Sequence, residues 1–257
     1  MNPNGARRPA LVAKHGGSRS HATALIPAAG RGTRVGGSRP KQFRPLGEMS
    51  LLANTLTVFQ SSALIDEIVL VVPPGDEEAC RQEIVDRYAL SKVTRIVPGG
   101  SSRQESVAGG LRAVDPDASL VLIHDAARPF VTADLIRRVL EAAASSGAAI
   151  AAIPVVDTLK RRSSPNSGVV TIERDGVWAA QTPQAFHRSL LVQAFAQAAA
   201  DGFTGTDDAS LVERLGHPIA LVDGHPANIK ITTAEDLEFA EDLIALRQAT
   251  GSRSGTG

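Results

Sequence analysis

The sequence predicts an α/β protein built on a mainly parallel sheet. Short, continuous apolar runs rich in β-branched residues alternate with segments whose apolar residues recur at helical spacing. Strands buried on both faces of a sheet have this continuous apolar character. Regular alternation of strands and helices is the pattern of a sheet covered by helices. A third observation, a glycine-rich turn directly after the first apolar run, fits the strand-to-loop turns of this fold class.

The elements follow in order along the chain. The expected buried strands are 23–27, 67–72, 93–97, 119–123 and 148–153, and the expected helices between them are 51–61, 76–88, 101–114 and 133–145. Ser50 and Thr132 stand where N-caps are needed for two of these helices. Helices at 187–200 and 206–215, a strand near 218–222 and a helix at 233–249 complete the predicted domain.

The segment 154–177 departs from this alternation. Two extended stretches, 155–160 and 169–174, flank a polar Ser-Pro-Asn-Ser-Gly turn, which predicts a long β-hairpin that leaves the main sheet. An isolated hairpin is marginally stable in water. We therefore expect a projecting arm that packs against a second subunit and forms a homodimer.

Composition limits the possible functions. The 257 residues carry 27 basic and 27 acidic side chains, so a formal net charge of zero gives no indication of nucleic-acid or membrane binding. Cys80 is the only cysteine, which excludes an internal disulfide, and its polar neighbours predict an inert thiol. No apolar run in 1–22 is long enough for a signal peptide or a membrane span, and we expect a cytoplasmic protein. The basic segment 1–22 and the Gly/Ser-rich segment 250–257 are expected to be disordered, leaving a folded domain over 23–249.

The segment from Leu25 to Phe43 is the most informative part of the chain. It reads L-I-P-A-A-G-R-G-T-R-V-G-G-S-R-P-K-Q-F and contains no acidic residue. Small residues allow backbone N–H groups to approach a ligand, and the cations Arg31, Arg34, Arg39 and Lys41 suit a polyphosphate. A P-loop is excluded because Lys41 follows Pro40, and the dinucleotide fingerprint is excluded because Val35 replaces its third glycine. The segment resembles the signature loop of nucleotidyltransferases.

Two further loops are expected on the same rim of the sheet, since ligands of such sheets bind outside the carboxyl ends of the strands. In the 98–106 loop, glycines permit backbone contact with a base or ribose, Ser106 offers a hydroxyl, and Ser101 or Ser102 is expected to cap the next helix. The 124–130 loop begins His124-Asp125. Asp125 is a candidate Mg²⁺ ligand or the partner of Arg128 in a structural salt bridge.

Two other side chains have alternative interpretations. His124 is a candidate general base, but a lone histidine at a strand end is more often structural, which is the interpretation that we favour. Lys230 lies between two apolar residues on an expected strand, where it points into a cleft to meet a phosphate or lies on the surface. Lysine is scarce here, with five among 27 basic residues, which makes Lys41 and Lys230 more informative.

Taken together, these motifs resemble the 2-C-methyl-D-erythritol 4-phosphate cytidylyltransferase family over about 23–247. The resemblance is carried by P-A-A-G-x-G-x-R at 27–34, P-K-Q-F at 40–43, G-G-x-x-R-x-x-S at 99–106, H-D-A-A-R-P at 124–129, D-T-L-K at 157–160, E-R-D-G-V-W at 173–178, Q-T-P-Q at 181–184, T-D-D-A-S at 206–210 and N-I-K-I-T at 228–232. It implies a Rossmann-like α/β domain, a β-arm that forms a homodimer, and dependence on Mg²⁺.

The resemblance also implies residue roles. Arg34 and Lys41 would hold the triphosphate of CTP, and Arg34, Lys41, Arg174 and Lys230 would be the catalytic cations. The nucleotide side would comprise Pro27, Ala28, Ala29, Gly30, Gly32, Gly99, Gly100, Ser106, Ala126 and Arg128. Asp125, Thr158, Arg174, Thr182, Thr206 and Lys230 would surround methylerythritol phosphate, with Arg174 supplied by the partner subunit and Asp125 assisting the metal.

Three rival functions remain at the level of sequence. Another cytidylyltransferase, such as one acting on ribitol 5-phosphate, would share most of these motifs. A nucleotide-sensing protein on a degenerate transferase fold is disfavoured because Lys41, Asp125 and Lys230 are all present. A nicotinamide dehydrogenase is disfavoured by Val35.

Overall fold

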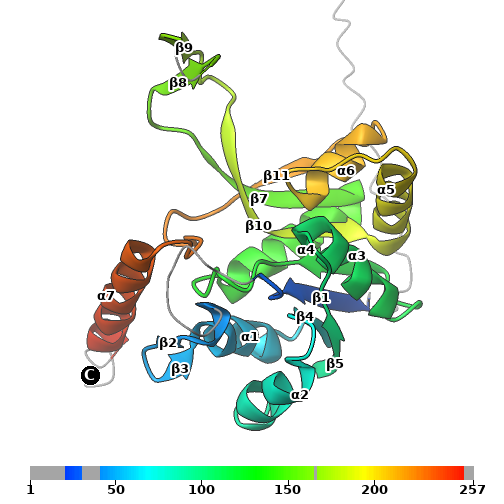
Figure 1. Ribbon diagram of the computed structural model, residues 1–257, viewed down its shortest axis with the longest axis vertical. Coiled ribbons are helices and arrows are strands. Elements are labelled where there is room, and N and C mark those ends of the chain that lie inside the picture. The colour runs from blue at the N-terminus through cyan, green and yellow to red at the C-terminus, as the bar shows by residue number, and fades with distance from the viewer. Residues whose placement is uncertain (1–20, 31–40, 165–166, 252–257) are drawn as a thin grey trace, which may run out of the picture.

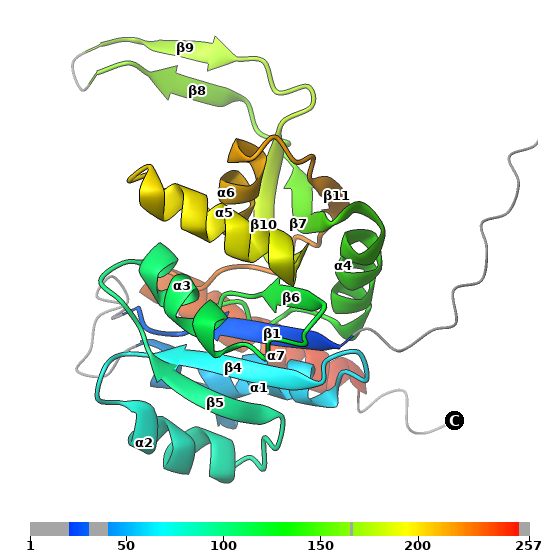
Figure 2. The same ribbon diagram turned by 90° about the vertical axis from the view of Figure 1, so that its right-hand side faces the viewer.

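The computed structural model describes residues 21–30, 41–164 and 167–251, with side chains described for 21–30, 42–164 and 167–246. Seven strands form one sheet in the order β11-β7-β10-β6-β1-β4-β5, with helices on both faces (Figures 1 and 2). The strands are β1 (Ala22–Pro27), β4 (Glu67–Val72), β5 (Val93–Pro98), β6 (Leu120–Ile123), β7 (Ala148–Pro154), β10 (Trp178–His187) and β11 (Ala220–Asp223). The α/β prediction is confirmed.

The sheet is parallel except at one strand. β1 pairs in parallel with β4 and β6, β4 pairs in parallel with β5, and β7 pairs in parallel with β11. β10 lies between β6 and β7 and is antiparallel to both. β10 was not predicted from the sequence. Its pairing with β7 shifts register between Ala180 and Gln184, which is where Pro183 interrupts the pattern expected of a central strand.

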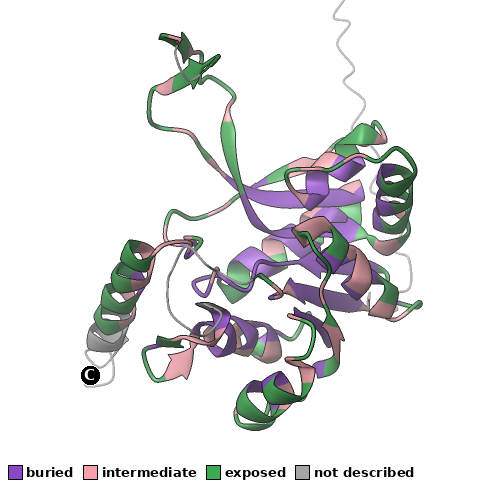
Figure 3. Ribbon diagram, viewed as in Figure 1, coloured by how far each residue is buried: buried purple, intermediate pink, exposed green. Residues whose placement is uncertain are grey.

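Each face of the sheet has its own apolar core. On one face, α1 (Leu51–Ser61), α2 (Glu77–Cys80) with its π-helical continuation η3 (Arg81–Asp86), and α4 (Ala133–Ser146) pack around Ala24 and Ile26. On the other, α3 (Arg103–Ala113), α5 (Arg188–Ala200) and α6 (Asp208–Arg214) pack around Leu25. Burial therefore follows the sheet and the inner faces of the helices (Figure 3).

Local sequence signals explain where several helices begin. The Ser50 hydroxyl accepts a hydrogen bond from Ala53 N at 3.1 Å, and Thr132 caps α4 in the same way, so both predicted caps are confirmed. Cys80 is buried, and burial raises the pKa of its thiol to about 12, which agrees with an inert role.

The C-terminal part of the domain packs as a separate layer beside α1. A third apolar cluster joins Leu46 and Leu51 to Ile231 and to Ala240 of α7 (Ala234–Gly251). The short elements η2 (Lys41–Phe43), β2 (Pro45–Leu46) and β3 (Met49–Ser50) lead from the glycine-rich loop into α1. None of the described helices has the length and apolar character required to cross a membrane.

A two-stranded arm projects from the ends of β7 and β10 (Figures 1 and 2). β8 (Leu159–Arg162) and β9 (Val169–Ile172) pair antiparallel, with Leu159 opposite Ile172. The predicted projecting hairpin is confirmed, although its strands are shorter than the predicted stretches 155–160 and 169–174. Val156 on the arm is 75% exposed, and Val169 and Val170 are about half exposed. These apolar side chains are available for an interface.

Candidate active site

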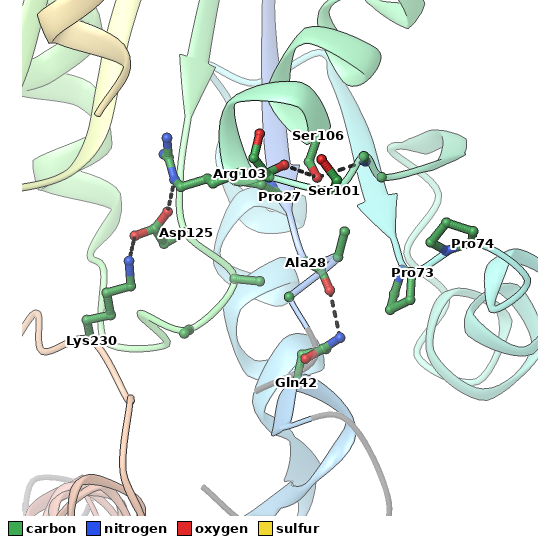
Figure 4. A pocket seen from close by; sticks show the side chains of 17 residues that line it. Pro27, Ala28, Gln42, Pro73, Pro74, Ser101, Arg103, Ser106, Asp125 and Lys230 are labelled. Atoms are coloured by element: carbon green, nitrogen blue, oxygen red, sulfur yellow. Dashed lines mark hydrogen bonds and ion pairs between the residues drawn. The ribbon is translucent and has the colours of Figure 1, made fainter. Parts of the chain in front are cut away.

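A cavity of about 820 Å³ opens at the carboxyl ends of the parallel strands (Figure 4). This is the edge at which such sheets bind ligands, and the volume suits a nucleotide-sized molecule. Its lining residues follow β1, β4, β5 and β6, and two more segments add Gln42 and Lys230: Pro27, Ala28, Ala29, Gly30, Gln42, Pro73, Pro74, Gly99, Gly100, Ser101, Ser102, Arg103, Ser106, Asp125, Ala126, Ala127 and Lys230.

The loop after β1 is held close to the loop after β5. Ala28 N donates to Val71 O at 2.7 Å, and Gly99 N donates to Val72 O at 2.8 Å, so both loops are hydrogen-bonded to the end of β4, which lies between them. A Cβ at Gly99 would lie 2.2 Å from the Ala29 Cβ, an approach that only glycine permits. The buried Gln42 side chain donates to Ala28 O at 2.7 Å and fixes the other end of the glycine-rich loop.

Ser106 organises the loop that begins α3. Its hydroxyl accepts a hydrogen bond from Gly100 N at 3.1 Å and donates to Ser102 O at 2.8 Å. Ser102 in turn accepts from Glu105 N, which confirms it as the helix cap. Ser106 is buried at the cavity wall, so its hydroxyl fixes the backbone that faces a ligand.

Four charged residues form a chain of ion pairs that begins on one side of the cavity and ends behind its wall. Lys230 Nζ lies 2.8 Å from Asp125 Oδ2, and Arg103 Nε lies 3.1 Å from Asp125 Oδ1. Arg103 Nη2 lies 2.7 Å from Oδ2 of the buried Asp208. Figure 4 shows Arg103 and Lys230 reaching the Asp125 carboxylate from opposite sides. The alternative pairing of Asp125 with Arg128 is wrong, because Arg128 Nη1 donates to the carbonyl of Asn228 at 2.7 Å.

The charge balance of this chain keeps Asp125 ionised. Burial alone would raise the pKa of Asp125, but the charges of Arg103 and Lys230 outweigh it and hold that pKa well below its usual range. The pKa of Asp208 is raised by burial, with Arg103 acting against this effect. The Arg103 guanidinium loses solvation, but the two carboxylates raise its pKa above the ordinary value.

His124 is structural. It is fully buried, and burial lowers its pKa to about 4, so the imidazole is neutral at pH 7. The Thr182 hydroxyl accepts a hydrogen bond from Asp125 N at 3.0 Å and lies 3.1 Å from His124 Nδ1, to which it donates. His124 Nε2 then donates to Arg128 O at 3.0 Å. The pair therefore holds the backbone that carries Asp125, and the favoured structural interpretation is confirmed.

The cavity gathers ten of the residues predicted for the site: Pro27, Ala28, Ala29, Gly30, Gly99, Gly100, Ser106, Asp125, Ala126 and Lys230. Five others lie outside its wall: Arg128, Thr158, Arg174, Thr182 and Thr206. Gly32 and Arg34 fall outside the described residues, as does the Lys41 side chain. Thr182 reaches the site indirectly, through its hydrogen bond to Asp125 N. Thr158 and Arg174 are on the arm.

The expected strand around Lys230 is wrong, because 228–232 is an irregular segment. It is anchored at single points: Ile231 N donates to Ala127 O at 2.8 Å, and the Asn228 amide donates to Thr182 O at 2.8 Å. Ile231 is completely buried, so the residue before it is directed toward the cavity. Lys230 is 40% exposed, but it lines the cavity and its Nζ pairs with Asp125, so it belongs to the site and not to the open surface.

Sequence reasoning assigned no role to several lining residues. Arg103 was noted only as part of a motif, although a cation directly after a helix cap on the ligand rim was a usable signal. Pro73 and Pro74 follow β4 and mark another strand end on the same rim. Gln42 was likewise noted only as part of the P-K-Q-F motif, because nothing local in the sequence shows that its side chain is buried against Ala28 O.

The described cavity wall offers a single carboxylate to a divalent metal ion such as Mg²⁺. Asp125 is the sole carboxylate among the described lining residues, and no group of three or more His, Cys, Asp or Glu side chains suited to a metal occurs in the described ranges. Mg²⁺ is commonly held by one or two carboxylates together with substrate phosphates and water. The described residues fit that mode, in which the ligand supplies most of the oxygens.

The comparisons with known proteins agree with this geometry. The family model of IspD, 2-C-methyl-D-erythritol 4-phosphate cytidylyltransferase, matches residues 22–246. The chain belongs to this family. A relative from Syntrophus aciditrophicus, named 2-C-methyl-D-erythritol 4-phosphate cytidylyltransferase, is 49% identical over 221 residues, which cover 86% of this chain and 94% of the relative.

Solved structures of the IspD family share the fold. A 2-C-methyl-D-erythritol 4-phosphate cytidylyltransferase from Thermus thermophilus is 40% identical with a TM-score of 0.72, covering 87% of this chain and 98% of that one. A 4-diphosphocytidyl-2C-methyl-D-erythritol synthase from Anaerococcus prevotii is 33% identical with a TM-score of 0.77, covering 89% and 100%. The α/β nucleotidyltransferase architecture is therefore common to them.

Proposed function

We propose that this protein transfers CMP from CTP to 2-C-methyl-D-erythritol 4-phosphate. The products are 4-diphosphocytidyl-2-C-methyl-D-erythritol and pyrophosphate, and the reaction belongs to isoprenoid precursor biosynthesis. The observation that carries the proposal is the cavity at the strand ends, where the IspD motif residues Gly30, Gly100, Asp125 and Lys230 converge from four separate segments.

The cavity divides into two sides. Ala28, Ala29 and Gly30 lie on the first together with Gly99 and Gly100, and these small residues leave backbone groups open to the cavity. This side suits the flat base and the ribose of CTP, since a ligand can approach backbone groups closely. The other side carries Lys230, whose positive charge suits the phosphate groups that react, and Asp125, whose carboxylate suits the metal ion that would accompany them.

The reaction needs positioning and charge neutralisation. A phosphate oxygen of the acceptor attacks the α-phosphorus of CTP in line, and pyrophosphate leaves with the bonding electrons. A phosphate monoester has a second pKa near 6, so the nucleophile is already anionic at about pH 7. No strong general base is required, which is consistent with a buried, neutral His124.

The cations of the site bind the two phosphate-bearing substrates and neutralise their charge. Two polyanions must be brought together, and charge that develops in the transition state must be stabilised. Lys230 lines the cavity, where its ammonium group can contact a phosphate. We assign Arg34 and Lys41 to the triphosphate by family resemblance. Asp125 would hold Mg²⁺, and the ion would neutralise phosphate oxygens when bound.

Two residues proposed to bind the acceptor, Thr158 and Arg174, require a dimer to reach an active site. In the single chain both side chains lie on the exposed arm, outside the cavity wall. We therefore propose a homodimer in which the arm of one subunit brings Arg174 to the neighbouring site. The proposed compartment is the cytoplasm, because CTP and the acceptor are highly charged and do not cross a membrane unaided.

Substrate comparison tests the function. Pyrophosphate release should be measured with CTP and Mg²⁺ in the presence of methylerythritol phosphate, ribitol 5-phosphate or no acceptor. We expect rapid release only with methylerythritol phosphate. Faster release with ribitol 5-phosphate would assign the enzyme to another polyol phosphate, and no release with either acceptor would contradict the transferase proposal.

A further inference from the structure

One guanidinium group connects three distant segments at the cavity. Arg103 is the first residue of α3, Asp125 follows β6, and Asp208 is the first residue of α6. Nε of Arg103 contacts the Asp125 carboxylate at 3.1 Å, while Nη2 contacts Asp208 at 2.7 Å. The arginine side chain is 31% exposed and lines the cavity.

Asp208 acts only from behind the site. Its side chain is 2% exposed, and it is absent from the cavity wall. Burying a carboxylate is costly unless it is paired, and Arg103 provides the pairing charge. Asp208 therefore fixes the direction of the guanidinium without itself being available to a ligand.

A neighbouring side chain strengthens the same connection. The Gln104 amide donates to Phe203 O at 3.0 Å and accepts from Gly205 N at 2.9 Å. Both contacts hold the segment just before α6 against the start of α3. Thr206, an exposed residue predicted to meet the acceptor, lies between Gly205 and Asp208 in this segment.

We infer that Arg103 is a positioning residue that aligns the acceptor side of the site with its nucleotide side. It holds Asp125 at one carboxylate oxygen, opposite Lys230, and anchors the segment carrying Thr206 through Asp208. The inference rests on the proposed function, since it concerns how that reaction is aligned. A planar guanidinium holds two carboxylates at fixed directions, which a lysine ammonium does not reproduce.

Kinetics of Arg103→Lys and Asp208→Asn test the inference. We expect Arg103→Lys to lower kcat/KM for methylerythritol phosphate by about 10- to 100-fold, since misplacement of reacting groups by about 1 Å has effects of this size. The dissociation constant of CTP with Mg²⁺, measured by calorimetry, should change by less than about threefold. Asp208→Asn should lower the same kcat/KM by about tenfold or more, although Asp208 does not line the cavity.

The double variant shows whether Arg103 and Asp208 act through their mutual contact or impair the enzyme independently. Because both residues act through one contact, Arg103→Lys with Asp208→Asn should be no slower than Arg103→Lys alone. Arg137→Lys is the matched control: Arg137 pairs with Asp134 at 2.6 Å on the exposed face of α4, and its replacement should leave the kinetics unchanged.

Three results would overturn the inference. These are wild-type kinetics in Asp208→Asn, additive losses in the double variant, or a CTP affinity that falls as far as kcat/KM. If Arg103→Lys fails to fold, the isosteric Asp208→Asn enzyme still decides the question. Wild-type enzyme that releases no pyrophosphate from CTP and methylerythritol phosphate would instead contradict the proposed function.

Discussion

The ammonium group of Lys230 lies 2.8 Å from the carboxylate of Asp125, 105 residues earlier in the chain. The carboxylate holds the flexible lysine at the cavity before any ligand binds, so less side-chain freedom is lost when the phosphates arrive. Burial of Asp125 makes this pairing obligatory, because an unpaired buried carboxylate is unfavourable. Local hydrogen bonds at Asn228 and Ile231 then determine which side chain of the 228–232 segment enters the site.

Removing divalent metal should abolish CTP-dependent activity, and adding Mg²⁺ should restore it. Asp125→Asn should lower kcat/KM by about 100-fold or more, because one preorganised charged group is lost, and should raise the Mg²⁺ concentration needed for half-maximal rate. Pyrophosphate release against free Mg²⁺ measures both effects. Asp117→Asn, an exposed change on the turn before β6, is the control. Full activity in excess chelator, or an unchanged Mg²⁺ requirement in Asp125→Asn, would contradict this role.

Lys41→Ala should lower kcat by about 100-fold or more, the size expected when one preorganised transition-state contact is lost. The expectation rests on the P-K-Q-F motif and on the scarcity of lysine in the chain. Steady-state rates at saturating CTP and acceptor give the measurement. Lys92→Gln is the control, since Lys92 stands just before β5, at the amino ends of the parallel strands and away from the cavity. Near-normal turnover in Lys41→Ala would remove this residue from the mechanism.

The elements predicted from sequence were those whose signals are local. Continuous apolar runs gave the parallel strands, and Ser50 and Thr132 marked helix starts because capping involves residues only three positions apart. β10 was missed because Pro183 and its polar neighbours break the apolar pattern of a central strand. The irregularity that accommodates Pro183 arises from pairing with β7, where Ala180 lies opposite Ala152 and Gln184 opposite Ile150, and this pairing is not visible in the segment itself.

The part of the candidate site that was predicted also depends on local sequence signals. Gly30, Gly100 and Asp125 follow strands, and the parallel topology brings strand ends together. The strand expected at Lys230 was wrong because two flanking isoleucines imitate a strand, whereas Ile231 is instead a single buried anchor. The Arg103–Asp208 pair spans 105 positions and has no local pattern, so only tertiary packing reveals it.

His124 should make the protein less stable in mild acid. Its pKa is about 4 in the folded protein, against about 6.5 in an unfolded chain. Below pH 6.5 the unfolded state binds the proton more readily, so stability should fall as pH decreases from 6.5 toward 4. The loss is on the order of 3 kcal/mol at most. Urea unfolding of wild type and His124→Asn at pH 7.5, 6 and 5 measures it. The loss attributable to His124 should be absent in the variant, and identical pH profiles would contradict the assignment.

The arm should complete the active site of the neighbouring subunit. Arg174→Ala and Lys230→Ala enzymes are each expected to be nearly inactive. After mixing in equal amounts and exchanging subunits, about half of the dimers should be mixed. If Arg174 acts across the interface, one site in each mixed dimer carries both defects and the other carries neither. Activity should then recover toward about 25% of wild type.

The arm experiment has its own control and two contrary outcomes. Arg161→Ala, a change on β8 at an exposed residue that is not among the predicted site residues, should dimerise and react normally, which verifies that the arm tolerates loss of an exposed arginine. The exposed Val156, Val169 and Val170 should be covered in the dimer, so light scattering should give twice the monomer mass. Absence of recovery despite proven subunit exchange would mean that Arg174 acts within its own chain. A monomer at working concentration would reject the arm as an interface, because 75% exposure of Val156 would then persist in the active enzyme.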